Sequence, residues 1–123
     1  MDILYSRQEE LHLLTEREVT VAGLGGVGSW LAIFAAMSGV PTLYLFDHDI
    51  VEESNRNRLP FCQAAVGRPK VDVVKEFAQA IRPECQVVAV QAKLEGVLLK
   101  LQLDFSDVIV DCTDSYRSQC SPQ

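Results

Sequence analysis

A glycine-rich turn between a short apolar stretch and a helical one constrains this chain more than any other feature. Residues 19–28 read V-T-V-A-G-L-G-G-V-G, and residues 29–37 then have the composition of a helix. Strand, glycine turn and helix in this order are typical of a nucleotide-binding α/β unit. One glycine permits the tight turn, another lets a phosphate approach the backbone, and another lets the helix pack closely on the strand. The N–H groups at the helix N-terminus would then bind the anion.

Length and charge limit the classes of protein to which the chain can belong. Its 123 residues are enough for one domain with one core. The 11 basic and 17 acidic residues give a net charge of −6, which argues against a nucleic-acid-binding surface. The longest apolar run, residues 30–37, is too short to span a bilayer, and residues 1–3 lack a signal-peptide pattern. We therefore expect a cytoplasmic protein without a nucleic-acid or membrane partner.

The four cysteines, Cys62, Cys85, Cys112 and Cys120, form no C-x-x-C pair. Their spacing therefore indicates neither a zinc site nor a redox dithiol. Cys112 lies in the D-C-T-D run at 111–114, and we expect it to be a buried core thiol and not a nucleophile.

The order of strand and helix patterns predicts the fold. Strands are expected at residues 19–22, 42–46, 86–90 and 108–110, and helices at residues 27–38, 69–81 and 94–101. Alternating strands and helices imply right-handed parallel crossovers, and hence an α/β fold with a Rossmann-like parallel sheet in the order 3-2-1-4 and helices on both faces. The chain would form one domain, with an N-terminal arm at 1–15, a core at 19–114 and a frayed tail at 115–123.

Two of the predicted helices carry more specific expectations. The helix at 27–38 is apolar nearly all round, which predicts burial against the sheet, and Gly39 is placed to end it in the left-handed conformation. Gly96 would lie inside the helix at 94–101 and weaken it by about 1 kcal/mol.

Candidate binding residues follow the second strand. Asp47 lies 19 residues after Gly28, where a dinucleotide-binding domain places the acid that binds the ribose hydroxyls. An NAD-binding domain is compatible with this much of the pattern. His48, beside it, is expected to be an exposed loop histidine.

Cations in the next segments favour a triphosphate over a dinucleotide. Arg58 lies in S-N-R-N-R at 54–58 and Lys70 in G-R-P-K at 67–70. A pyrophosphate is satisfied by helix N–H groups, whereas phosphate transfer requires cationic side chains on the moving phosphates. Asp114, just beyond the fourth strand, suits Mg²⁺, which takes one or two carboxylates together with phosphate oxygens.

With these segments in place, the sequence resembles the ThiF/MoeB/HesA superfamily, the ATP-dependent activating enzymes for ubiquitin and its sulfur-carrier relatives. The resemblance covers Tyr5 to Asp114 through five motifs in order: Y-S-R-Q, G-L-G-G-V-G, D-H-D-I-V-E-E-S-N-R-N-R, G-R-P-K and D-C-T-D. It implies adenylation of the C-terminal carboxylate of a ubiquitin-like or sulfur-carrier protein, with ATP and Mg²⁺.

The resemblance also implies roles for individual residues. Asp47 would bind the ribose, Asn55, Arg58 and Lys70 the phosphates, and Asp114 the metal. Arg7, on the arm, would reach into the site of a dimer partner and would act in catalysis with Arg58, Lys70 and Asp114. The expected nucleotide-binding residues are Gly23, Gly25, Gly26, Gly28, Asp47, Asp49, Ser54, Asn55, Arg58, Lys70 and Ser115.

The sequence departs from the family pattern in two ways. Leu59 follows Arg58 where the family usually has glutamine, and the family's second half does not follow Asp114. Without that half, the strand at 108–110 would be an open edge, which we expect to be covered by a second copy or by the tail. Two other functions stay open: an NAD(P)-dependent oxidoreductase domain, and a catalytically silent interaction module with the same fold.

Overall fold

The computed structural model describes residues 17–53 and 65–113. Within them, the chain folds into a four-stranded parallel sheet in the order β3-β2-β1-β4. The strands are β1 (Glu18–Ala22), β2 (Thr42–Phe46), β3 (Gln86–Val90) and β4 (Val108–Asp111). The predicted topology is confirmed, with β1 and β4 each one residue longer than expected.

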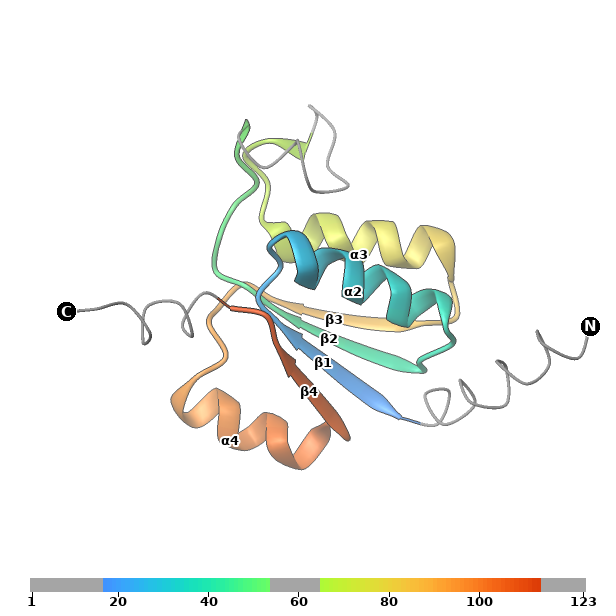
Figure 1. The fold of residues 1–123 in the computed structure, drawn as a ribbon, viewed down its shortest axis with the longest axis vertical. Coiled ribbons are helices and arrows are strands. Elements are labelled where there is room, and N and C mark those ends of the chain that lie inside the picture. The colour runs from blue at the N-terminus through green and yellow to red at the C-terminus, as the bar shows by residue number, and fades with distance from the viewer. Residues whose placement is uncertain (1–16, 54–64, 114–123) are drawn as a thin grey trace, which may run out of the picture.

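In the described residues, three helices cover the sheet: α2 (Gly26–Met37), α3 (Lys70–Ile81) and α4 (Gly96–Phe105). Figure 1 shows α2 and α3 side by side on one face of the sheet and α4 on the other. The main core lies between the sheet and the α2–α3 layer, where Val21, Leu43, Leu45 and Val74 are fully buried. Tyr44, which alternates with the two leucines of β2, is half-buried on the α4 face, so that this face is less well covered.

The helix at 27–38 is buried against the sheet as expected, but only on one of its sides. One face of α2 packs on the sheet, and the opposite side leaves large apolar side chains exposed. These are Val27, Trp30, Phe34 and Met37, which are 75%, 53%, 57% and 59% exposed, respectively. We call them the α2 stripe, because their spacing places them along one side of the helix. Gly39 has a φ of 98°, as expected for the residue that ends the helix.

The last helix also differs from its prediction. Gly96 is the first residue of α4, with a φ of 59°, and is not an interior residue that weakens the helix. The helix continues to Phe105, because no glycine or proline interrupts residues 97–105 and the helix is anchored to the sheet. The anchor is Gln102, the buried residue of α4, whose side-chain amide donates a 2.9 Å hydrogen bond to Thr20 of β1.

Candidate functional site

The glycine turn between β1 and α2 divides its tasks among three glycines. Gly23 has a φ of 93°, and its N–H donates to the Phe46 carbonyl at 2.8 Å, which ties the turn to the end of β2. A Cβ on Gly28 would overlap the Gly23 carbonyl oxygen, so the close approach of α2 to β1 requires glycine there. A Cβ on Gly25 would meet nothing within 4 Å. Gly25 therefore faces the open space that a ligand can occupy.

Asp47 holds this turn in place from the end of β2. Its side chain is 8% exposed, and its Oδ2 accepts a 2.6 Å hydrogen bond from the Leu24 N–H inside the glycine turn. Its Oδ1 accepts a 2.8 Å bond from the N–H of Asp49. A carboxylate offers about four acceptor positions, so the two bonds leave capacity for ligand hydroxyls. The residue predicted to bind ribose thus also positions the turn.

Lys70 reaches the same region from the start of α3. The loop after β2 is held against the segment before α3 by the hydrogen bonds Val51 N–H to Arg68 O (2.8 Å) and Lys70 N–H to Asp49 O (3.1 Å). The Lys70 side chain is 7% exposed, and within the described ranges it forms no ion pair. Buried lysines are normally paired with a negative group. The ammonium group therefore marks a place for an anion.

The turn, Asp47 and Lys70 line one pocket of about 780 Å³ at the carboxyl ends of the strands. This is the edge at which open α/β sheets bind their ligands. Leu94, Leu99 and Ile109 give the pocket an apolar wall. Its complete lining is Ala22, Gly23, Gly25, Phe46, Asp47, His48, Asp49, Lys70, Lys93, Leu94, Glu95, Leu99, Ile109, Asp111, Cys112 and Thr113.

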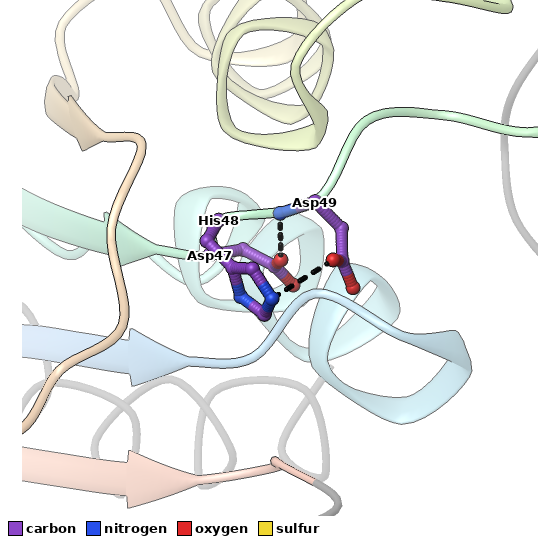
Figure 2. Close-up of side chains that lie close together, drawn as sticks. All are labelled: Asp47, His48 and Asp49. Atoms are coloured by element: carbon purple, nitrogen blue, oxygen red, sulfur yellow. Dashed lines mark hydrogen bonds and ion pairs between the residues drawn. The ribbon is translucent and has the colours of Figure 1, made fainter.

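The end of β2 also brings three possible metal ligands together. Figure 2 shows Asp47, His48 and Asp49, whose ligand atoms lie within 4.8 Å of one another. His48 Nε2 lies 3.1 Å from Asp49 Oδ1, and both side chains are 53% exposed. The expected exposure of His48 is confirmed. The three groups are already engaged with each other or with backbone N–H groups, so their proximity has a structural explanation without a metal.

Five of the predicted nucleotide-binding residues meet in this pocket, namely Gly23, Gly25, Asp47, Asp49 and Lys70. Gly26 and Gly28 lie immediately beyond it, in the first turn of α2. The other predicted site residues lie outside the described parts of the chain: Arg7, Ser54, Asn55, Arg58, Asp114 and Ser115.

Sequence reasoning missed the loop from Lys93 to Glu95, and it named the end of β4 only through the D-C-T-D motif, without assigning Asp111 or Thr113 to the site. The available signal was positional, because both segments follow the carboxyl ends of parallel strands. The expectation for Cys112 holds in part, since its thiol is half-buried rather than buried. Burial, and then the negative charge of Asp111, raise the pKa of Cys112, so that the neutral thiol is favoured.

Comparison with known proteins identifies the family. The family model described as "ThiF family" matches residues 3–122. The chain belongs to the ThiF family. This ThiF-family chain is 36% identical over 119 residues to the sulfur carrier protein ThiS adenylyltransferase of Escherichia coli. It is 37% identical over 110 residues to the tRNA threonylcarbamoyladenosine dehydratase of Bacillus subtilis.

Solved structures agree with this assignment. The ThiF-family chain superposes with a TM-score of 0.79, at 30% identity, on the E. coli tRNA N6-threonylcarbamoyladenosine dehydratase in complex with ATP. The superposition covers 86% of this chain and 44% of the dehydratase chain. The alignment with the E. coli adenylyltransferase covers 96% of this chain and 46% of that protein. The alignment with the B. subtilis dehydratase covers 88% of this chain and 43% of that protein. The chain thus spans less than half the length of the proteins it resembles.

No helix in the described part of the ThiF-family chain is long and apolar enough to cross a membrane.

Proposed function

We propose that this chain is the nucleotide-binding half of an ATP-dependent adenylating enzyme. The observation that carries the proposal is Lys70, a buried cation that faces a glycine turn and has no ion-pair partner in residues 17–53 and 65–113. A bound nucleotide would supply the missing negative charge through its phosphates. The similar E. coli dehydratase has been solved with ATP, which supports this choice of ligand.

The pocket provides chemically distinct groups for the parts of ATP. The Gly25 backbone and the N-terminus of α2 offer space and N–H groups to phosphates, and no acidic side chain lies in the first turn of α2. Leu94, Leu99 and Ile109 offer an apolar wall to the base. Asp47, held by the N–H groups of Leu24 and Asp49, retains acceptor positions for the ribose hydroxyls.

The proposed reaction joins a carrier protein to AMP. An oxygen of the carrier's C-terminal carboxylate would attack the α-phosphorus of ATP, and the bond to pyrophosphate would break. Lys70 would stabilise negative charge on the phosphates, as cationic groups do in phosphoryl transfer. Mg²⁺, when bound, neutralises phosphate charge. The carboxylates of Asp49 and Asp111 at the pocket are ligands of the type it prefers, and Asp114 remains the predicted ligand.

The expected substrate is a ubiquitin-like or sulfur-carrier protein. Two relatives whose names refer to such carriers support this class of substrate. They are the E. coli sulfur carrier protein ThiS adenylyltransferase and the SAMP-activating enzyme E1 of Haloferax volcanii, which is 34% identical to this chain over 108 residues. In each of these relatives, the part of the sequence outside the match is longer than the matched part. The adenylation of a carrier therefore requires groups beyond those in this chain.

Nucleotide titration and an exchange assay test the proposal together. We expect calorimetry to show tighter binding of ATP with Mg²⁺ than of NAD, because only the triphosphate needs the Lys70 charge. We also expect no carrier-dependent ATP–pyrophosphate exchange by these 123 residues. Tighter binding of NAD would favour an oxidoreductase domain, and no nucleotide binding by a folded chain would favour a silent interaction module. Robust carrier-dependent exchange would contradict the need for a second half.

We also propose that the chain forms a homodimer through the α2 stripe. The helix contains no charged residue over Gly26–Met37, so contact between two copies there places no like-charged side chains of α2 opposite each other. The stripe begins at Val27, beside the glycine turn. Its residues Val27, Trp30 and Phe34 line a shallow apolar groove together with Leu31. A partner on this surface would lie next to the nucleotide site, where its Arg7 could act.

The variant Phe34→Glu tests the dimer. Phe34 is 57% exposed, so the substitution is expected to leave the fold intact but to place a carboxylate in each half of the interface. Sedimentation should show a dimer at micromolar concentration for the wild type and a monomer for Phe34→Glu. Leu103→Glu is the matched control, because Leu103 is 62% exposed on α4, on the other face of the sheet. A dimer that survives Phe34→Glu would place the interface elsewhere.

A further inference from the structure

A chain of hydrogen bonds between polar side chains joins helix α4 to the sheet. The Gln102 side-chain amide donates to the Thr20 hydroxyl at 2.9 Å, and the Thr20 hydroxyl donates to the Ser106 hydroxyl at 2.8 Å. The Ser106 hydroxyl donates to the carbonyl oxygens of Glu18 in β1 and Val108 in β4, each at 2.9 Å. We call Thr20, Gln102 and Ser106 the α4 network. It connects the helix to two neighbouring strands.

The α4 network is polar but enclosed. Thr20 is fully buried, and Gln102 is 5% exposed. Within residues 17–53 and 65–113, the buried side-chain polar atom without a hydrogen-bond partner is Arg82 Nε, at the end of α3 on the other face of the sheet (Figure 1). The buried polar atoms of the network are therefore satisfied, which is the condition under which such groups are tolerated in a protein interior. Removing one partner would leave the other with an unmade hydrogen bond.

The apolar side chains of α4 do not by themselves select one rotation of the helix about its axis. Over Gly96–Phe105 the sequence is G-V-L-L-K-L-Q-L-D-F, with leucine at positions 98, 99, 101 and 103. Successive helical residues are about 100° apart, so these leucines point in several directions. Each of them is at least 36% exposed, whereas the residue that α4 buries is Gln102.

A different rotation would give α4 a more apolar contact with the sheet. Leu98, Leu101 and Phe105 follow the spacing i, i+3, i+7, so they share the side of the helix next to that of Gln102. If apolar burial alone decided the packing, this side would face the sheet. The structure instead places Gln102 there, opposite a hydroxyl. The polar contact therefore determines the rotation of the helix.

The rotation of α4 decides which leucine reaches the nucleotide pocket. Leu99 lies three residues before Gln102 on the same side of the helix, and it lines the pocket together with Ile109 of β4. Thr20 pairs in register with Ile109, so the α4 network contacts the sheet directly beside the apolar wall of the pocket. A rotation that moved Gln102 off Thr20 would move Leu99 out of that wall.

We propose that Thr20 and Gln102 are positioning residues for the base of the nucleotide, because they fix the rotation of α4 that keeps Leu99 in the pocket wall. Neither residue lines the pocket, so both act through Leu99. A buried polar residue can select one register among packings of similar apolar area, as it does in coiled coils. The inference rests on the proposed function for the identity of the ligand, whereas the rotation of α4 can be measured without a ligand.

Two substitutions at Thr20 separate its hydroxyl from its packing. Thr20→Ser keeps the hydroxyl and removes the methyl group, whereas Thr20→Val keeps the shape and removes the hydroxyl. In calorimetric titration of the whole chain, Thr20→Val should weaken ATP binding about tenfold, the scale of one lost apolar side-chain contact. Thr20→Ser should stay within about twofold of the wild type. Inorganic tripolyphosphate is the probe for the phosphate end, and its affinity should change less than about twofold in both variants, as for a site remote from the substitution.

The double variant Thr20→Val with Gln102→Leu provides a second test, in case Thr20→Val alone is too unstable. It replaces both partners by apolar groups of similar size, which is nearly neutral or stabilising for folding. We expect its urea midpoint to equal or exceed that of the wild type, while ATP binding weakens about tenfold. Methyl NMR of the ligand-free chain should show one set of contacts between position 20 and α4 in the wild type. Additional contacts should appear in the double variant, because α4 then adopts more than one rotation.

The alternative results have distinct meanings. Equal weakening of ATP and tripolyphosphate would show a general disturbance of the pocket, and Thr20→Ser as weak as Thr20→Val would assign the role to packing. Either result overturns the proposal. So does a double variant that keeps the single set of contacts or the wild-type ATP affinity. A wild-type chain that binds neither ATP nor tripolyphosphate would contradict the proposed function instead, and the contacts at position 20 would then decide whether the α4 network fixes the helix.

Discussion

Replacing Gly28 with alanine is expected to lower the free energy of unfolding by about 3 kcal/mol, the upper range for overpacking a core. The added Cβ would overlap the carbonyl oxygen of Gly23 and would lie 3.2 Å from the Cβ of Cys112. Both obstacles belong to the framework, since Gly23 is tied to β2 and Cys112 to β1 by backbone hydrogen bonds. The clash can therefore be relieved only by moving α2 away from the sheet. Urea denaturation monitored by circular dichroism measures the loss.

Gly25→Ala is the matched control for this prediction. Gly25 belongs to the same turn, has a φ of −74°, and a Cβ there would meet no atom within 4 Å. We therefore expect its unfolding free energy to stay within about 0.5 kcal/mol of the wild type, as for a substitution that creates no clash. Nucleotide binding should nevertheless weaken, because the methyl group would occupy the space left for phosphate. Equal destabilisation by both substitutions would contradict the division of tasks among the glycines.

The sheet and the glycine turn could be predicted from the sequence because their signals are local. A β-branched run followed by G-L-G-G-V-G fixes a strand, a turn and a helix start within ten residues. Alternation of strands and helices then leaves few topologies, since parallel crossovers are right-handed. The predicted order was therefore correct even though the start of α4 was not.

The exposed side of α2 could not be predicted in the same way. Periodicity identifies a buried face by its contrast with a polar one, and α2 has no charged residue on any side. Trp30 and Phe34 therefore resemble core residues in the sequence, although both are more than half exposed. Which apolar face packs on the sheet is decided by the glycine and alanine positions, Gly28, Ala32 and Ala36, whose small side chains permit close approach.

The pocket wall at Lys93–Glu95 was missed for a different reason. These residues form no recognisable motif, and they reach the site because β3 ends at the same edge as β1 and β2. Asp47 was identified, but its bond to the Leu24 N–H was not, because that contact joins segments 23 residues apart. Motifs therefore identified ligand-facing groups, while the groups that position them depended on the tertiary structure.

Replacing Lys70 with methionine is expected to weaken ATP binding about ten- to a hundredfold. This corresponds to about 1.5–3 kcal/mol, the usual contribution of a hydrogen bond to a charged group. Methionine retains an unbranched side chain of similar length, so the substitution removes the charge with little change in packing. Because Lys70 is 7% exposed and has no ion-pair partner in the described residues, removing its charge is not expected to destabilise the fold.

The combination of weaker binding and unchanged or higher stability separates a ligand role from a structural one. If Lys70 served packing alone, Lys70→Met would leave ATP affinity near the wild-type value. If it stabilised the fold through its charge, unfolding and binding would weaken together. Lys100→Met is the control, since Lys100 is an exposed lysine of α4 outside the pocket lining, and it should change the ATP dissociation constant less than about twofold.

NAD, with two phosphates instead of three, should lose less affinity than ATP on Lys70→Met, because fewer phosphate oxygens can reach the ammonium group. An equal loss for both ligands would mean that Lys70 contacts a part of the nucleotide that the two share, and that the pocket does not select the triphosphate.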